Sequence, residues 1–214
     1  MEAVRSACPR RDLVVIGASA GGVDTLKIVV AGLPADLPAT VCIVLHISPK
    51  SPSALARILA RSGPLRCHQA DDGEELRLGE ILVAAPDRHL EIEGNHARLT
   101  LGPRENGHRP AVDALFRSAA RARDGRVIGV VLSGNRDDGA AGLATIHAGG
   151  GATIVQDPDE ALYPGMPTSA IANAIVDVVV PSEEIAGAIA AMVGSDAPSP
   201  PDASERLDRE PAAP

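Results

Sequence analysis

Short β-branched runs alternate with longer helical patterns along most of this chain, and no other feature limits its fold as strongly. Residues 13–16 read as a buried strand ending at Gly17, and Val23, Leu26 and Val30 then recur at helical spacing. The same patterns predict further strands at 41–45, 81–84, 127–132, 153–155 and 176–180, and helices at 51–63, 110–123, 138–148, 168–174 and 182–192. This alternation favours a doubly wound α/β fold, with a mostly parallel sheet and helices on both faces.

Two regions depart from the alternation. Residues 90–93 and 96–99 flank the turn signal Gly94-Asn95, which predicts an antiparallel β-hairpin outside the parallel sheet. From residue 194 onward the chain is polar and rich in proline without apolar periodicity. We therefore expect a flexible lead-in at 1–11, one folded domain at 12–193 and a disordered tail at 194–214.

Composition narrows the class of protein. The net charge of −8 disfavours binding to the phosphate backbone of nucleic acids. The sequence holds neither a signal-peptide pattern at its start nor a run of about 18 apolar residues, so we expect no membrane insertion. The three cysteines, Cys8, Cys42 and Cys67, are odd in number and widely spaced, which favours reduced thiols in the cytoplasm.

Reactive side chains follow three of the expected parallel strands. Ser19 follows the first strand, His46 the second, and Asp138 comes after the strand ending at Leu132. Because the carboxyl ends of parallel strands share one edge of a sheet, these three side chains are expected to meet there. A hydroxyl, an imidazole and a carboxylate are the set that acyl transfer uses, so a serine hydrolase is the leading hypothesis.

Ser19 also has other interpretations. A small residue in a glycine-rich turn can simply cap the next helix. A dinucleotide loop of the form G-x-G-x-x-G requires glycine at position 19, and the Walker pattern requires Gly-Lys, which the chain lacks here. The segment matches G-x-S-x-G, but in α/β-hydrolases that serine follows several strands and the histidine comes last.

The histidines are more easily explained as a base than as metal ligands. They occupy positions 46, 68, 89, 96, 108 and 147, without H-E-x-x-H or another metal-binding spacing. We therefore expect no metal and no cofactor. His46 is the best-placed base, although a structural role would be the better explanation if it stood alone.

Six segments, in order, resemble motifs of one family. They are residues 15–22 (VIGASAGG), His46 with Pro49, residues 85–89 (APDRH), residues 108–116 (HRPAVDALF), Leu132-Ser133-Gly134 followed by residues 138–142 (DGAAG), and residues 165–167 (GMP). Together they resemble the chemotaxis protein-glutamate methylesterases, the CheB family, from about residue 12 to residue 192. Six motifs in register make this resemblance specific.

The resemblance implies roles for particular residues. Ser19 takes the place of the nucleophile, His46 of the base and Asp138 of the acid that orients it. Backbone N–H groups near Ala20, Gly21 and Asn135 are implied to hold the oxyanion, and His108 and Met166 to line the cleft. The implied substrate is a glutamate methyl ester on the cytoplasmic domain of a chemoreceptor, and the family also deamidates glutamine.

The chain departs from the family at several positions. Ala20 stands where threonine is frequent, and Asn135-Arg136 replaces the usual Met-Gly. The eleven residues before the expected domain are too few for the family's receiver domain, so we expect a free-standing catalytic domain. Arg88, Arg109 and Arg136 lie in motif loops, where they either meet an acidic receptor surface or form salt bridges within the loops.

Two other functions stay open on the sequence alone. One is a catalytically idle member that binds or scaffolds a signalling complex, which a broken set of catalytic residues would indicate. The other is an esterase or amidase with a different substrate.

Overall fold

The computed structural model describes residues 10–47 and 54–195. The expected lead-in (1–11) and tail (194–214) therefore lie almost wholly outside the described residues, as does the expected start of the second helix at Ser51. The elements that are described fall within the expected domain, 12–193.

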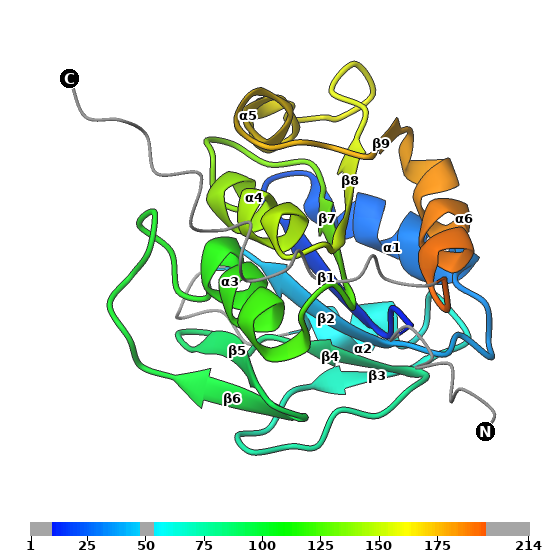
Figure 1. The fold of residues 1–214 in the computed structure, drawn as a ribbon, viewed down its shortest axis with the longest axis vertical. Helices are drawn as coiled ribbons and strands as arrows, with labels where there is room; N and C mark the ends of the chain where they lie inside the picture. The colour runs from blue at the N-terminus through cyan, green and yellow to red at the C-terminus, as the bar shows by residue number, and fades with distance from the viewer. Residues whose placement is uncertain (1–9, 48–53, 196–214) are drawn as a thin grey trace, which may run out of the picture.

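In the described residues seven strands form one sheet, in the order β3-β4-β2-β1-β7-β8-β9 (Figure 1). Every neighbouring pair runs parallel. The strands are β1 (Leu13–Ala18), β2 (Thr40–Leu45), β3 (Arg66–Gln69), β4 (Glu80–Val83), β7 (Val127–Val131), β8 (Ala152–Gln156) and β9 (Val178–Val180). The expectation of a mostly parallel sheet is confirmed.

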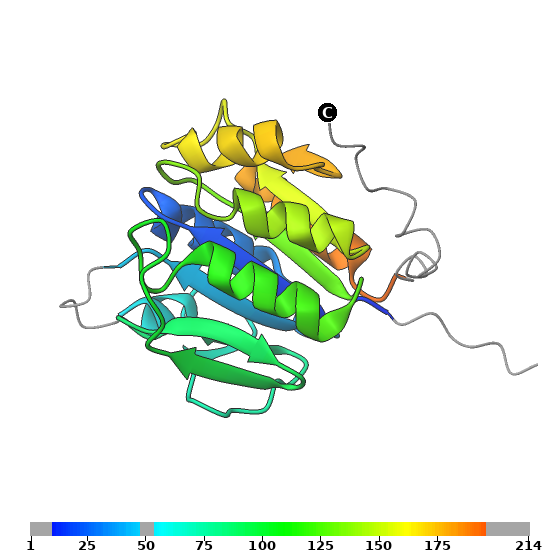
Figure 2. The same cartoon turned by 60° about the vertical axis from the view of Figure 1, so that its left-hand side comes forward.

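Helices cover both faces of this sheet, as expected (Figures 1 and 2). One face carries α1 (Gly22–Gly32), α2 (Leu55–Leu59) and α6 (Ser182–Met192), and the other α3 (Val112–Arg123), α4 (Ala140–Ala148) and α5 (Gly165–Asn173). Each face has its own aliphatic core, because Val14 and Ile16 of β1 point into one cluster and Leu13 and Val15 into the other.

The predicted hairpin is present and forms a separate sheet. Its strands are β5 (His89–Glu93) and β6 (His96–Thr100), which pair antiparallel. The hairpin packs against α3, with Leu90 and Ile92 buried in the same cluster as the helix. The Ile92 N–H also donates to Ser118 Oγ of α3 at 3.0 Å.

Strand β3 was missed by the sequence prediction. Its four residues, Arg-Cys-His-Gln, carry no apolar run, because β3 lies at the edge of the sheet and is half-exposed. Pairing with β4 therefore defines this strand, rather than burial of its side chains.

Several helix boundaries were also wrong. The predicted 138–148 helix begins only at Ala140, because Gly139 adopts a left-handed φ of 102°. Asp138 therefore lies in the preceding loop. Helix α5 begins at Gly165, three residues earlier than predicted, since Pro167 is tolerated in a first turn, where its missing N–H has no partner to lose. Helix α2 ends at Leu59, before the predicted stop at Gly63.

The topology of the sheet predicts where a ligand-binding site lies. The chain leaves β1 towards β2 on one side, whereas β7 on the other side leads to β8 and β9. Ligands of open parallel sheets bind beyond the carboxyl ends of the strands at such a switch point. The loops beginning at Ser19, His46 and Leu132 leave β1, β2 and β7 at this edge.

Within residues 10–47 and 54–195, no helix combines the length and apolar character needed to cross a bilayer.

Candidate active site

Ser19 occupies a tight turn between β1 and α1. The turn is possible because Gly21 adopts a left-handed φ of 74° before the helix begins at Gly22. The Ser19 N–H donates to the Ser133 carbonyl at 2.9 Å, which ties the turn to the loop after β7. Gly134 allows the close approach, since a Cβ there would lie 2.7 Å from Ser19 Cβ.

His46 connects Ser19 to Asp138. It follows the last residue of β2, and its N–H donates to the Ala18 carbonyl at 3.1 Å. Its Nδ1 lies 3.0 Å from Ser19 Oγ, and its Nε2 lies 2.7 Å from Asp138 Oδ2. If Nδ1 is to accept the serine proton, the ring must carry its own proton on Nε2, and the carboxylate facing Nε2 favours that tautomer.

Asp138 is a buried carboxylate held at the start of α3. Only 1% of its side chain is exposed. Its Oδ2 accepts the Val112 N–H at 2.8 Å and its Oδ1 the Asp113 N–H at 2.9 Å. Burial raises the pKa of this carboxyl, but the hydrogen bonds from His46 and the two N–H groups outweigh burial and lower it. Asp138 is therefore ionised at neutral pH.

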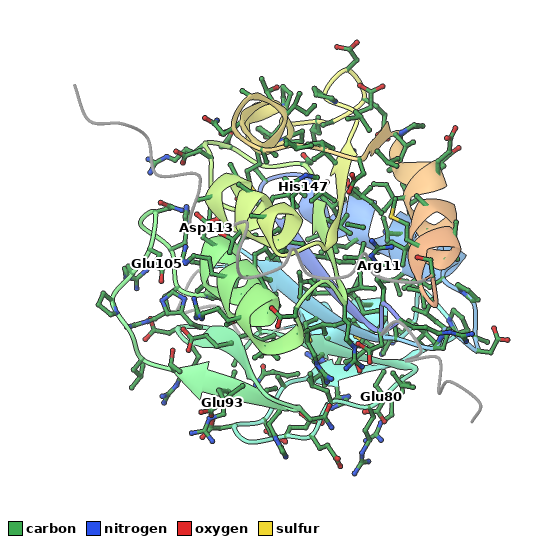
Figure 3. The ribbon with its side chains drawn as sticks, viewed as in Figure 1. Arg11, Glu80, Glu93, Glu105, Asp113 and His147 are labelled. Atoms are coloured by element: carbon green, nitrogen blue, oxygen red, sulfur yellow. The ribbon has the colours of Figure 1, made fainter. Side chains whose placement is uncertain are left out.

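Asp113 is a buried acid next to the site, and its sequence pattern predicted no role for it. Its Oδ1 accepts N–H groups of Gly139 and Gly142 at 3.0 and 2.7 Å, where α4 begins. Figure 3 labels it on the side of α3 that faces α4. Burial raises the pKa of this carboxyl. The motif at 108–116 contains Asp113, but only the packing of α3 against α4 reveals its partners.

His108 lies against His46. The two rings are stacked, with centroids 3.6 Å apart and planes 4° apart. Burial, and then the charge of His46, lower the pKa of His108. The structure thus brings this predicted cleft residue into direct contact with the predicted base.

The remaining predicted residues surround Ser19. In the described part of the chain the N–H groups of Ala20, Gly21 and Asn135 have no acceptor, so they are free to donate to a ligand. The Asn135 side chain is exposed. Met166 is buried, and its N–H donates to the Gly134 carbonyl at 2.8 Å, so it supports the loop behind Ser19.

The three loop arginines differ in their surroundings. Arg109 donates from Nε and Nη2 to Asp87 Oδ1 at 3.1 and 2.9 Å, and from Nη1 to the carbonyls of Leu101 and Gly102. It therefore forms a salt bridge within the loops. Arg88 and Arg136 are exposed and form no ion pair with the described residues.

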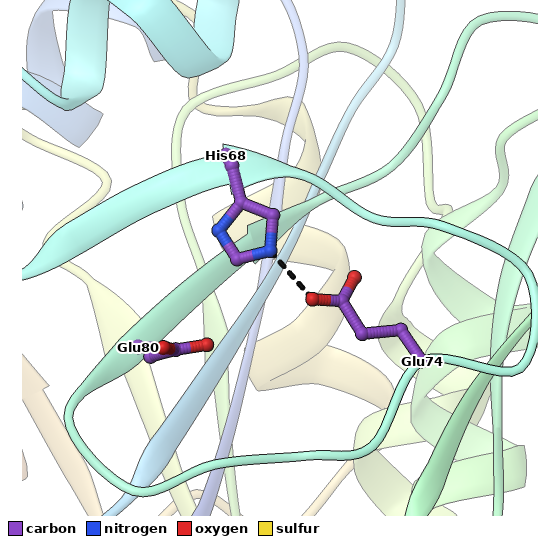
Figure 4. Close-up of side chains that lie close together, drawn as sticks. All are labelled: His68, Glu74 and Glu80. Atoms are coloured by element: carbon purple, nitrogen blue, oxygen red, sulfur yellow. Dashed lines mark hydrogen bonds and ion pairs between the residues drawn. The ribbon is translucent and has the colours of Figure 1, made fainter.

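A separate cluster of possible metal ligands lies at the β3 edge of the sheet, composed of His68, Glu74 and Glu80 (Figure 4). His68 Nε2 lies 2.6 Å from Glu74 Oε1, and Arg66 Nη1 donates to Glu80 Oε1 at 3.1 Å. His68 and Glu74 thus pair with each other, and Glu80 pairs with a cation of the protein itself. We therefore assign no metal site to this cluster, which shares no residue with the candidate active site.

Comparison with known families decides which family this is. The CheB methylesterase family matches residues 14–189. The chain belongs to the CheB methylesterase family. This membership confirms the resemblance that six sequence motifs indicated.

Relatives and a solved structure agree with the family. A protein of Anaeromyxobacter dehalogenans named protein-glutamate methylesterase/protein-glutamine glutaminase 2 is 41% identical over 189 residues, which are 86% of this chain and 55% of that protein. A Leptospira interrogans protein, whose name gives the same two activities provisionally, is 38% identical over 82% of this chain and 91% of its own length. The chain thus spans about half the length of the first relative.

The crystal structure of the Thermotoga maritima CheB methylesterase catalytic domain matches this fold with a TM-score of 0.81 and 32% identity. The match covers 85% of this chain and 98% of that domain. The fold expected for the family is therefore confirmed.

Proposed function

We propose that this chain is a serine hydrolase that demethylates glutamate methyl esters on proteins. The observation that carries this proposal is the hydrogen-bonded series from Ser19 through His46 to Asp138, at the strand ends where a parallel sheet binds its ligands. The names of the relatives support the same chemistry. Ser19 acts as the nucleophile, His46 as the base and Asp138 as the orienting acid.

The first half of the reaction forms an acyl-enzyme. His46 Nδ1 accepts the proton of Ser19 Oγ as the oxygen attacks the ester carbonyl, and Asp138 stabilises the resulting imidazolium. The free N–H groups of Ala20, Gly21 and Asn135 are the donors available for the developing oxyanion. The imidazolium then gives its proton to the leaving methoxide, and methanol departs.

The second half releases the product. His46 accepts a proton from water, which attacks the acyl carbonyl, and Ser19 leaves with that proton. The product is a free glutamate carboxylate. An amide can react in the same way with ammonia as the leaving group, so glutamine deamidation is included in the proposal.

We infer that the substrate is the cytoplasmic domain of a methyl-accepting chemoreceptor, and that the enzyme acts in the cytoplasm during chemotaxis or related signalling. Support comes from the relatives, whose names specify protein-bound glutamate and glutamine. The intact series of contacts argues against an idle scaffolding role, since a binding module has no need of it. An esterase acting on another ester remains the competing hypothesis.

Methanol release tests the substrate class. The purified chain is incubated with a receptor cytoplasmic fragment methylated on glutamate. In a parallel reaction it is incubated with a generic methyl ester that is similar in size to the methylated glutamate side chain. Methanol from the receptor fragment at a much higher kcat/KM than from the generic ester is the expected result. Equal values for both would favour a general esterase, and no release from either would reject the activity.

The loop behind the nucleophile has no room for a side chain at position 134. In Gly134→Ala the new Cβ would overlap Met166 Sδ and lie 2.7 Å from Ser19 Cβ, so Ser19 or the loop must move. We expect kcat to fall at least 10-fold, with a loss of about 1–3 kcal/mol in stability. The control is Gly187→Ala in α6, where a Cβ meets nothing within 4 Å. Ester hydrolysis and thermal melting measure the two effects, and unchanged kcat in Gly134→Ala would contradict the prediction.

A further inference from the structure

A tight turn between β6 and α3 carries two side chains into the site. Glu105 and His108 form an isolated antiparallel bridge, with their N–H and carbonyl groups exchanging hydrogen bonds of 3.0 and 2.8 Å. The central residues, Asn106 and Gly107, both have left-handed φ values, 51° and 83°. Asparagine followed by glycine is the pair that best tolerates this type of turn. The turn presents His108 to His46 on one side and the Asn106 amide to two buried acids on the other.

The Asn106 amide joins those two acids. Its Nδ2 donates to Asp113 Oδ2 at 2.9 Å and to Asp138 Oδ1 at 3.0 Å. A side-chain amide has two N–H donors, so both are used. Among the described residues, Asn106 provides the one hydrogen bond that Asp113 Oδ2 receives, and one of the two that Asp138 Oδ1 receives.

Each of the two acids accepts hydrogen bonds at the start of the helix next to the other acid. Asp138, which precedes α4, accepts N–H groups at the start of α3, while Asp113 of α3 accepts N–H groups at the start of α4. This arrangement brings two carboxylates close together in a buried place, and the charge of Asp138 is one of the causes that raise the pKa of Asp113. The neutral Asn106 amide donates one hydrogen bond to each carboxylate and so offsets their repulsion.

Other charged groups surround the pair. His46 Nε2 is hydrogen-bonded to Asp138, and His108 is stacked on the His46 ring. The positive charge of Arg117 influences both acids, and its guanidinium pairs with Glu105. The side chains of Asn106 and Asp113 also line a pocket of about 340 Å³, together with Asp137. Removal of the Asn106 amide would therefore leave a buried acid with an unpaired oxygen beside a polar pocket.

We propose that Asn106 is a positioning residue for the catalytic acid. By holding Asp138 Oδ1, it keeps Oδ2 aimed at His46 Nε2, and by holding Asp113 Oδ2 it lets both acids remain side by side. This inference rests on the proposed function, because the position of Asp138 matters for catalysis only if Ser19 reacts with the help of His46.

Two substitutions test the role with the backbone conformation kept. Asn106→Gly removes the amide but tolerates a positive φ, and Asn106→Asp has the same shape but brings a third carboxyl. We expect kcat for ester hydrolysis to fall about 10- to 100-fold in Asn106→Gly, with little change in KM, as for a lost hydrogen bond to a charged group. Asn95→Gly, in the hairpin turn, is the matched control and should keep the wild-type kcat.

The pH profile separates positioning from mere folding. At neutral pH the carboxylate of Asn106→Asp cannot donate and repels both acids, whereas its protonated form can donate one hydrogen bond. The activity of Asn106→Asp relative to Asn106→Gly should therefore rise as the pH is lowered from 8 to 6. A constant ratio, with both variants folded, would overturn the proposal.

A measurement without substrate makes the test independent of the proposed function. The Nε2 proton of His46, which faces Asp138, should give a downfield ¹H NMR signal in the wild type, identified by its loss in His46→Gln. In Asn106→Gly the signal should shift or broaden, and in Asn95→Gly it should not. An unchanged signal in Asn106→Gly would reject the positioning role even if ester hydrolysis is confirmed. A changed signal in a chain that hydrolyses no ester would leave the positioning intact and reject the proposed reaction.

Discussion

Ser19→Ala is expected to lower kcat for ester hydrolysis by about 10⁴- to 10⁶-fold, the range found when a catalytic serine is removed. The methyl group cannot form the acyl-enzyme, and His46 Nδ1, 3.0 Å from the hydroxyl in the wild type, loses the proton it would accept. The activity that remains reflects only the oxyanion donors and substrate binding. Methanol release under single-turnover conditions measures the loss.

The fold should not suffer, because the Ser19 N–H, rather than its hydroxyl, ties the turn to Ser133. Melting temperatures of the variant and the wild type should therefore agree closely. Ser62→Ala, on the surface beyond α2, is the control that removes a hydroxyl elsewhere. A serine-reactive phosphonate should label the wild type and Ser62→Ala but not Ser19→Ala. Wild-type kcat in Ser19→Ala would exclude this serine as the nucleophile.

The sequence could predict the meeting of Ser19, His46 and Asp138 because each follows a recognisable buried strand. Once the parallel sheet is inferred, the three residues must share one edge, whatever the details of the loops. The turn at Ser19 was equally predictable from its glycines, since the left-handed φ at Gly21 favours glycine.

Other parts of the site depend on tertiary contacts that no local pattern encodes. The helix predicted from residue 138 was wrong at its start, and that error hid the fact that the Asp138 side chain reaches α3 rather than its own helix. Asn106 carries only a turn signal in the sequence, and its link to Asp113 appears only when α3 packs against α4. The orientation of the His46 ring, with Nδ1 towards Ser19, is likewise set by its two partners.

Strand β3 illustrates the same limit in the fold. A half-exposed edge strand needs no apolar face, so Arg66–Gln69 resembles a loop until β4 is available to pair with it. The central strands were predictable because burial on both faces demands continuous apolar runs.

Asp138→Asn should reduce both catalysis and stability, which distinguishes it from Ser19→Ala. The amide oxygen of the variant can accept the hydrogen bonds of one position, but its NH₂ group must then occupy the other. In the Oδ2 position it faces His46 Nε2–H and the Val112 N–H, and in the Oδ1 position it faces the Asp113 N–H and the Asn106 amide. A donor would then face a donor in a buried place. We expect kcat to fall about 10⁴-fold, as when the orienting acid of a serine protease becomes an amide. The free energy of unfolding should fall by about 2–3 kcal/mol.

The stability loss should depend on pH with a definite sign. Because the pKa of Asp138 is lowered in the folded state, its carboxylate contributes stability that is complete above the pKa of an unfolded aspartate, about 3.9, and is lost as the pH falls through the lower folded pKa. Urea unfolding at pH 7 should thus show the full difference between wild type and Asp138→Asn, and unfolding near pH 3 a smaller one. Asp24→Asn, an exposed acid of α1, is the control and should change neither kcat nor stability at either pH. A difference for Asp138→Asn that stays constant down to pH 3 would mean that the charge of Asp138 does not stabilise the start of α3.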